Sequence, residues 1–213
     1  MKRDLYRMND KAPAGMFQVE DHHEAMKWCD QGWGIFWTIQ EFDGPRKIEN
    51  LKKINSWAVD IDGGDKKSQW ALVEKFVAPS YVIETRNGLH IYWDAKDGTK
   101  ENYQSIVADR LVYHFKADPR AKDLARVLRC PWYFHNKSEP FLCKVVYSAE
   151  RDYTEAQMLK HFPLPEELEV ESEKKQELRK NISPSGDTFW ERIWNLDCEQ
   201  GLLRLSGKSC VGS

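Results

Sequence analysis

Two aspartates, Asp60 and Asp62, have the type and spacing that most directly indicate chemistry in this sequence. They end an apolar run that leads into a glycine turn. Alternate side chains of a β-strand share a face, so both carboxylates would project together, while Trp57, Val59 and Ile61 cover the other face. Ionised carboxylates at this spacing repel each other unless a divalent cation or a proton lies between them. The pair predicts a site for Mg²⁺ or Mn²⁺, although a solvated strand end has the same pattern.

A β-hairpin is predicted at residues 81–93, where Asn87-Gly88 separates two β-rich runs. A two-residue turn at this point pairs Thr85 with His90. Cross-strand partners point to the same side, so these two side chains are expected together on a polar face. The opposite, apolar face would carry Leu89, Ile91 and Trp93.

A local excess of positive charge marks residues 118–137, which contain five basic and two acidic residues. The whole chain is nearly balanced, with 32 basic and 34 acidic residues, so its net charge indicates no nucleic-acid partner. Within the basic run, Arg126, Arg129 and Lys137 are candidates for binding phosphate groups. A solvated helix face would also explain the two arginines.

Length and composition limit the class of protein. A chain of 213 residues builds one good core, or one domain with an appendage. We predict a domain at 1–165, a charged linker at 166–186 and the start of a helical accessory domain at 187–213. Five cysteines without a C-x-x-C pair argue against a disulfide framework and against zinc, and they fit a reducing cytoplasm. No apolar run approaches the length of a membrane span, so no membrane contact is expected.

The secondary structure around these motifs follows from hydrophobic periodicity. Helices are predicted at 21–30, 66–77 and 100–115, strands at 34–39, 57–62 and 142–147, a turn at 43–45, and a helical or irregular piece at 49–55.

Three motifs in this order resemble the archaeo-eukaryotic primase superfamily, most closely the primase-polymerase domains of plasmid and phage replication proteins. They are D-I-D at 60–62, T-R-N-G-L-H at 85–90, and a run at 118–137 with the pattern D-x-x-x-x-D-x-x-R-x-x-R-x-P that ends in N-K. The likeness covers roughly residues 30–150. Trp132 stands where the family usually has glycine, and Asn136 and Lys137 are adjacent where it often has a residue between them.

The resemblance implies an α+β fold, the archaeo-eukaryotic primase catalytic fold, with mixed or antiparallel sheets around an RRM-like core, flanking helices and a C-terminal helical extension. It also implies the roles of individual residues. The catalytic metal ligands would be Asp60, Asp62 and Asp123, with Asp118 as the alternative third acid. The nucleotide-binding residues would be Thr85, Arg86, Asn87, His90, Arg126, Arg129 and Lys137.

The implied activity is nucleotidyl transfer by a DNA primase and polymerase in replication. Two Mg²⁺ or Mn²⁺ ions about 3.5–4 Å apart would stabilise the attacking and leaving oxygens. The expected partners are a single-stranded DNA template, NTPs or dNTPs, and a replicative helicase or helicase domain.

Two other classes of protein fit parts of the pattern. An apolar strand that ends in D-x-D-G also resembles the nucleophile motif of haloacid dehalogenase phosphatases, in which Asp60 would form an aspartyl-phosphate and Asp62 would act as general acid. That reading gives the histidine hairpin and the arginine cluster no role. A non-catalytic nucleic-acid-binding module would use the 118–137 run alone and leaves the paired carboxylates unexplained.

Overall fold

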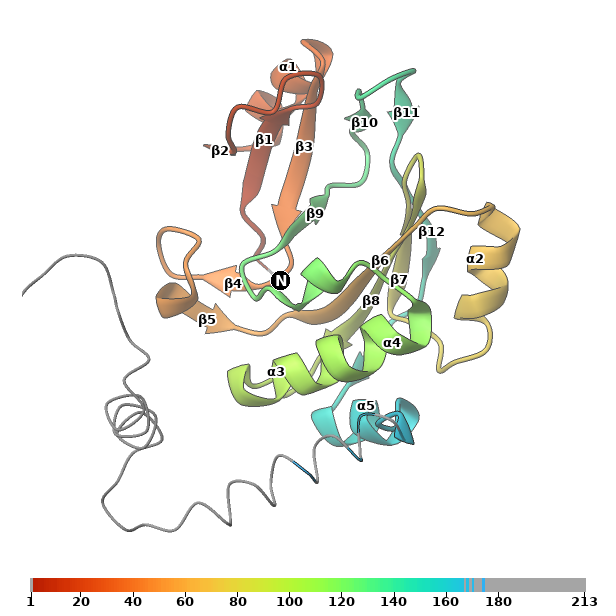
Figure 1. The fold of residues 1–213 in the computed structure, drawn as a ribbon. Helices are drawn as coiled ribbons and strands as arrows, with labels where there is room; N and C mark the ends of the chain where they lie inside the picture. The colour runs from red at the N-terminus through yellow and green to blue at the C-terminus, as the bar shows by residue number, and fades with distance from the viewer. Residues whose placement is uncertain (1, 167, 169, 171–173, 175–213) are drawn as a thin grey trace, which may run out of the picture. The chain divides into compact units, whose positions relative to one another are not determined.

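The structure is a computed structural model that describes residues 2–166, 168, 170 and 174 (Figure 1). Apart from these last positions, the predicted linker and accessory domain at 166–213 lie outside the described residues. The strands are β1 Leu5–Asn9, β2 Phe17–Val19, β3 Trp33–Thr38, β4 Glu41–Phe42, β5 Leu51–Lys53, β6 Ser56–Asp62, β7 Tyr81–Glu84, β8 Gly88–Ala95, β9 Val127–Arg129, β10 Phe134–His135, β11 Phe141–Leu142, β12 Lys144–Ser148 and β13 Asp152–Tyr153.

The α-helices are α1 His22–Asp30, α2 Lys66–Val73, α3 Lys100–Ile106, α4 Val112–Phe115 and α5 Glu155–His161. Shorter helical turns are η1 Ile48–Asn50, η2 Val107–Leu111 and η3 Pro119–Lys122. Among the described residues, no helix has the length and apolar character that crossing a membrane requires.

The larger sheet has the order β12-β7-β8-β13, with β6 also paired to β8. Strands β6 and β8 run antiparallel, in a register that extends from Ser56 opposite Asp94 to Asp62 opposite Gly88. Because side chains alternate along each strand, this register gives the sheet one apolar face and one face that carries Asp60 and His90.

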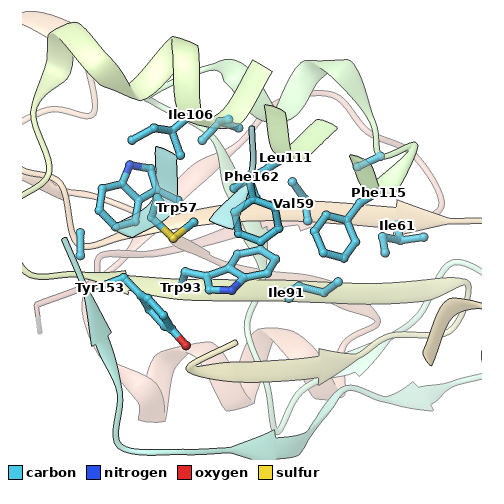
Figure 2. Packing of buried hydrophobic residues seen from close by; sticks show 14 of the residues in the cluster. Trp57, Val59, Ile61, Ile91, Trp93, Ile106, Leu111, Phe115, Tyr153 and Phe162 are labelled. Carbon is cyan, nitrogen blue, oxygen red and sulfur yellow. The ribbon is translucent and has the colours of Figure 1, made fainter. Parts of the chain in front are cut away.

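The main core lies between the apolar face of this sheet and the helices α3, α4 and α5 (Figures 1 and 2). Figure 2 shows Trp57, Val59 and Ile61 of β6 beside Ile91 and Trp93 of β8, with helical side chains packed against them. All five residues are buried, as are the β8 residue Leu89, the helical residues Ile106, Leu111 and Phe115, and Phe162, which directly follows α5. The apolar faces predicted from the sequence for both strands are therefore confirmed.

The second sheet has the order β2-β1-β3-β9. Helix α1 packs on one of its faces through Ala25 and Cys29, which contact Leu5 and Ile35 in a small core. A further buried cluster joins the two sheets, and it contains Ile39, Ala58, Ile83, Tyr92, Leu128 and Cys143. The face of β6 that carries Ala58 and the two aspartates therefore looks toward β3 and β9.

The predicted α+β class with predominantly antiparallel sheets is confirmed, and most predicted elements are present. Three predictions of element boundaries need correction. The segment at 49–55 includes strand β5, helix α2 ends at Val73 instead of continuing to residue 77, and the predicted strand at 142–147 is split at Cys143. The predicted helix at 100–115 is continuous, but its middle turn, η2, is a π-helix, a wide turn that often marks functional regions.

The predicted two-residue hairpin turn is wrong, because the loop between β7 and β8 is longer. Glu84 pairs with Leu89 and Ile83 with His90, so Gly88 begins β8 and residues 85–87 form the loop. The Thr85 hydroxyl closes it, because it lies 3.1 Å from both the backbone nitrogen and the carbonyl oxygen of Gly88. Lys66 donates to the carbonyl oxygens of Thr85 and Gly88. The partners shift by two residues, an even number, so every side chain keeps its predicted face.

Gly88 has no room for a side chain, because a Cβ atom there would lie 1.6 Å from the carbonyl oxygen of Ile61. We predict that Gly88→Ala forces β6 and β8 apart and lowers the free energy of unfolding by about 3 kcal/mol or more. Gly98→Ala is the comparison, because its Cβ would also overlap a neighbour, at 2.6 Å from Ile54 Cγ2, but would meet side-chain atoms instead of backbone and should therefore cost less. Urea denaturation of both variants measures the difference, and an equal or smaller loss for Gly88→Ala would contradict the prediction.

Candidate active site

A pocket of about 200 Å³ lies where β6 and β8 of the larger sheet face β3 and β9 of the second sheet. It is lined by Phe36, Asp60, Asp62, Thr85, Asn87, His90, Arg126, Val127, Leu128, Arg129, His135 and Lys137. The three sequence motifs therefore converge on one pocket. Of the predicted site residues, only Arg86, Asp118 and Asp123 are not among those that line it.

Asp60 and Asp62 lie on the same face of β6, but their surroundings differ. Asp60 is 9% exposed, whereas Asp62 at the strand end is exposed. Burial raises the pKa of Asp60 from its ordinary value of 3.8 to about 6, even though the charge of Arg126 acts in the opposite direction. Burial and repulsion from Asp60 also raise the pKa of Asp62. The fold thus holds two carboxylates where negative charge is unfavourable in the absence of a cation.

His90 projects into the same pocket from β8, directly opposite Asp60 in the register. Its Nε2 lies 3.4 Å from Asp60 Oδ1. Burial lowers the pKa of His90 to about 3, so the imidazole is neutral at pH 7 and this contact is not an ion pair. The sequence predicted His90 on the polar face with Thr85. Both residues line the pocket, although the longer loop places Ile83, not Thr85, opposite His90.

Arg129 at the end of β9 and Arg126, which precedes that strand, both line the pocket, and each is held by an acid. The Arg126 guanidinium lies 3.0 Å from the Asp118 carboxylate. Arg129 forms two hydrogen bonds with the Asp10 carboxylate, at 3.0 and 2.7 Å, and its guanidinium lies over the Phe36 ring. Asp10 is almost fully buried. Gly34 leaves the space for this pair, because a Cβ atom there would lie 2.5 Å from the Arg129 guanidinium.

The end of the basic run places its last two residues differently. Asn136 is buried, and its amide nitrogen donates to the carbonyl oxygens of Cys29 and Trp33, at 3.2 and 3.3 Å. These bonds tie the loop to the second sheet and leave the exposed Lys137 at the pocket. Asn136 therefore has a structural role.

The two candidates for a third acid lie in different surroundings. Asp118 follows helix α4, and its backbone N–H donates to the carbonyl oxygen of Asp60 at 3.0 Å. Burial opposes ionisation of its carboxylate, but hydrogen bonds from Arg120 and the charge of Arg126 lower its pKa. Asp123 is exposed, and its carboxylate accepts a bond from the backbone of Ala125 at 2.9 Å. The spacing to the arginines favoured Asp123, whereas the backbone bond to Asp60 sets Asp118 next to that residue, and neither Asp118 nor Asp123 is among the residues that line the pocket.

Trp132 stands where the resembled family usually has glycine, and its backbone conformation shows how the loop accommodates this difference. Its φ of 72° is left-handed, a conformation that glycine adopts at little cost and that is unfavourable for a bulky residue. Its backbone nitrogen donates to the carbonyl oxygen of Cys143 at 2.7 Å, and the side chain is 65% exposed. The loop thus keeps a backbone shape suited to glycine and directs the indole outward.

Two polar residues at the site were not predicted from the sequence: His135, which lines the pocket, and Asp10, which binds Arg129. Asp10 gave no local signal, because its partner Arg129 is 119 positions away. His135 lies inside the basic run, but the resemblance assigns no role to that position. Its place in the pocket depends on β10, which no hydrophobic period marked.

No family model matches the chain. A curated relative from Clostridium perfringens, described as "Replication protein", is 30% identical over 122 residues. That match covers 49% of this chain and only 30% of the relative's length.

Solved structures show a more extensive likeness. The AEP domain of the cyanophage S-2L primase-polymerase matches with a TM-score of 0.63 at 17% identity, over 76% of this chain and 89% of that one. The primase RepB′ matches with a TM-score of 0.61 at 13% identity, over 93% of this chain and 70% of that one. The catalytic domain of RepB′ in complex with initiator DNA matches with a TM-score of 0.55 at 14% identity, over 82% and 89% of the two chains. The resemblance drawn from the three motifs is confirmed at the level of the fold: the chain has the fold of the AEP domains of primase-polymerases.

Proposed function

We propose that this chain is a metal-dependent nucleotidyltransferase, a DNA primase-polymerase domain that makes primers or extends DNA on a single-stranded template from NTPs or dNTPs. The observation that carries the proposal is one pocket in which Asp60 and Asp62 lie with Arg126, Arg129 and Lys137. Carboxylates that bind divalent cations and basic side chains that bind phosphates are what a nucleoside triphosphate with its metal ions requires.

The carboxylates fit a divalent cation. Asp60 Oδ1 is buried and has no hydrogen-bond partner among the described groups. Burial raises the pKa of both aspartates in spite of nearby cations, so a divalent cation bound at the carboxylates would favour their charged forms. No group of three or more acidic, histidine or cysteine side chains forms a ready-made metal cluster in the described part of the chain. Asp60 and Asp62 would therefore be the principal ligands. Asp118 would act as a third acid when Arg120 and Arg126 no longer bind its carboxylate.

Divalent cations bound there would stabilise the oxygens that attack and leave the α-phosphate. The chain's own residues would perform the remaining tasks. Arg126, Arg129 and Lys137 would bind the phosphate oxygens, and Asp10 would keep the Arg129 guanidinium oriented. The neutral His90 would donate a hydrogen bond to the nucleotide without adding charge.

The comparisons support this reading over its rivals. One structural neighbour is described as a primase catalytic domain in complex with initiator DNA, which supports a DNA template. The curated relative is described as a replication protein, which supports replication as the setting. The fold favours the primase-polymerase over the phosphatase, and buried carboxylates among phosphate-binding cations favour an enzyme over a simple binding module. A replicative helicase stays a predicted partner.

The first test is template-dependent extension of a labelled primer with NTPs or dNTPs and Mg²⁺ or Mn²⁺. We predict that Asp60→Asn plus Asp62→Asn lowers incorporation by about a hundredfold or more, because the ligands of the catalytic cations lose their charge. Asp65→Asn is the control, because it removes a nearby charge while asparagine still caps helix α2.

Three results would contradict the proposal. Incorporation that survives the double substitution would show that the carboxylates are not catalytic. Phosphate release from a monoester without nucleotide incorporation would favour the phosphatase. Template binding that ignores divalent cations and gives no turnover would favour the binding module.

The third acid is tested by comparing Asp118→Asn with Asp123→Asn in the same assay. Because Asp118 adjoins Asp60 and Asp123 bonds only within its own loop, we expect a loss of about a hundredfold for Asp118→Asn and nearly native activity for Asp123→Asn. Thermal unfolding of both variants checks that the loss is not unfolding. The reverse order of activities would assign the role to Asp123.

The buried charge of Asp60 also predicts a pH effect on the metal-free protein. Because its pKa is raised from 3.8 to about 6, the folded state binds the proton more tightly than the unfolded state, and stability falls as pH rises from about 4 to 6. The full cost above pH 6 is at most about 3 kcal/mol. We predict that Asp60→Asn, measured by urea denaturation with EDTA, is more stable than the native chain at pH 7.5, and that this gain shrinks at pH 4.5. A destabilised variant at both pH values would refute this account.

A further inference from the structure

His135 is a second imidazole in the pocket, and neither the motifs nor the comparisons assign it a role. It lies in β10, opposite Phe141 of β11, and lines the pocket together with Arg129 and Lys137. The side chain is 7% exposed. His135 therefore reaches the pocket from β10, two residues before Lys137.

Both ring nitrogens of His135 are buried and have no hydrogen-bond partner within the described part of the protein. Buried polar atoms are satisfied in most folded proteins, and the exceptions concentrate at functional sites. Burial lowers the pKa of His135 to about 4, and the charge of Arg129 acts in the same direction. At pH 7 the ring is neutral, so it offers one N–H donor and one acceptor.

The charges around the two imidazoles distinguish the ends of the pocket. His135 is influenced by the cations Arg129, Arg86 and Lys137 and by one acid, Asp10. That acid is already engaged by the Arg129 guanidinium and by the backbone N–H of Asn136.

His90 is also influenced by cations, namely Arg129, Arg126 and Lys66, but it contacts the Asp60 carboxylate and is influenced by the charge of Asp62, which His135 is not. His135 thus marks the cationic end of the pocket, and His90 marks the carboxylate end.

We propose that His135 binds the terminal phosphate of a nucleoside triphosphate in this pocket, an inference that rests on the proposed function. The reacting α-phosphate belongs at Asp60 and Asp62, because nucleotidyl transfer occurs there. The rest of the triphosphate then extends toward the cationic end, where His135 lies. A neutral imidazole contributes a directed hydrogen bond to a phosphate oxygen, whereas the neighbouring cations contribute charge that diphosphates and triphosphates share.

The test is nucleotide binding in the absence of a template, measured by calorimetry with Mg²⁺ and either a nucleoside triphosphate or the matching diphosphate. His135→Phe keeps an aromatic ring in β10 and removes the hydrogen bond. We expect it to weaken triphosphate binding about tenfold and to leave diphosphate binding unchanged, so that the preference for the triphosphate falls.

Three further variants make the result specific. His135→Gln keeps a donor and should retain most of the preference for the triphosphate. His135→Ala removes the hydrogen bond without adding bulk and should lose the preference, so it serves if His135→Phe does not fold. His23→Phe is the matched control, because His23 is exposed on helix α1 and does not line the pocket. Thermal unfolding of each variant shows whether the fold is intact.

The outcomes separate this inference from the function on which it rests. An unchanged ratio of triphosphate to diphosphate affinity in folded His135→Phe overturns the role of His135 alone. An equal loss for both nucleotides also overturns it, because it shows that the ring only shapes the pocket. A native chain that binds neither nucleotide overturns the proposed function as well.

Discussion

Seven residue pairs join β6 to β8 in antiparallel register, and the placement of both the core and the site depends on this pairing. On one face, Trp57, Val59 and Ile61 meet the helices. On the other face, Asp60 comes directly opposite His90. A slip of one residue would turn the aspartates into the helical core and the tryptophan toward the pocket, at a large cost in free energy. Hydrophobic burial on one side of the strand therefore fixes the position of the carboxylates on the other.

The electrostatics of the pocket follow from how its charges are paired. Arg129 is bound by Asp10, and Arg126 is bound by Asp118 at 3.0 Å. These pairs orient the arginines and keep them from forming a close ion pair with Asp60, which remains buried beside a neutral histidine. An arrangement selected for stability alone would satisfy that carboxylate within the protein. The cost is consistent with a site that is completed by a bound cation and its substrate.

The segment from Arg129 to Lys137, which contains β10, shows how one backbone shape tolerates different sequences. Trp132 occupies a left-handed conformation in which glycine would be unstrained, and its side chain points into solvent. Asn136 is withdrawn into hydrogen bonds with Cys29 and Trp33, which leaves Lys137 at the pocket. The departures from the family pattern therefore change the surface of the loop while its basic residues still reach the site.

Local periodicity was enough to predict several parts of this protein. Alternation along residues 57–62 and 89–93 predicted which side chains enter the core, and it placed Asp60, Asp62 and His90 on the opposite face. The order of the three motifs also predicted the fold. The length of the hairpin loop could not be predicted from local pattern. It depends on hydrogen bonds from the Thr85 and Lys66 side chains to the loop backbone and on the close contact of Gly88 with β6.

Tertiary packing brings distant residues to the pocket or to the residues that line it. Asp10 meets Arg129 across 119 positions, and a pair so far apart leaves no trace in local patterns. The position of Asp118 beside Asp60 depends on where helix α4 ends against β6, whereas spacing along the chain favoured Asp123. His135 enters the site through the short strand β10, which is held by its pairing with β11. Periodicity determines the face on which a side chain lies, but the packing of separate elements determines which side chains it meets.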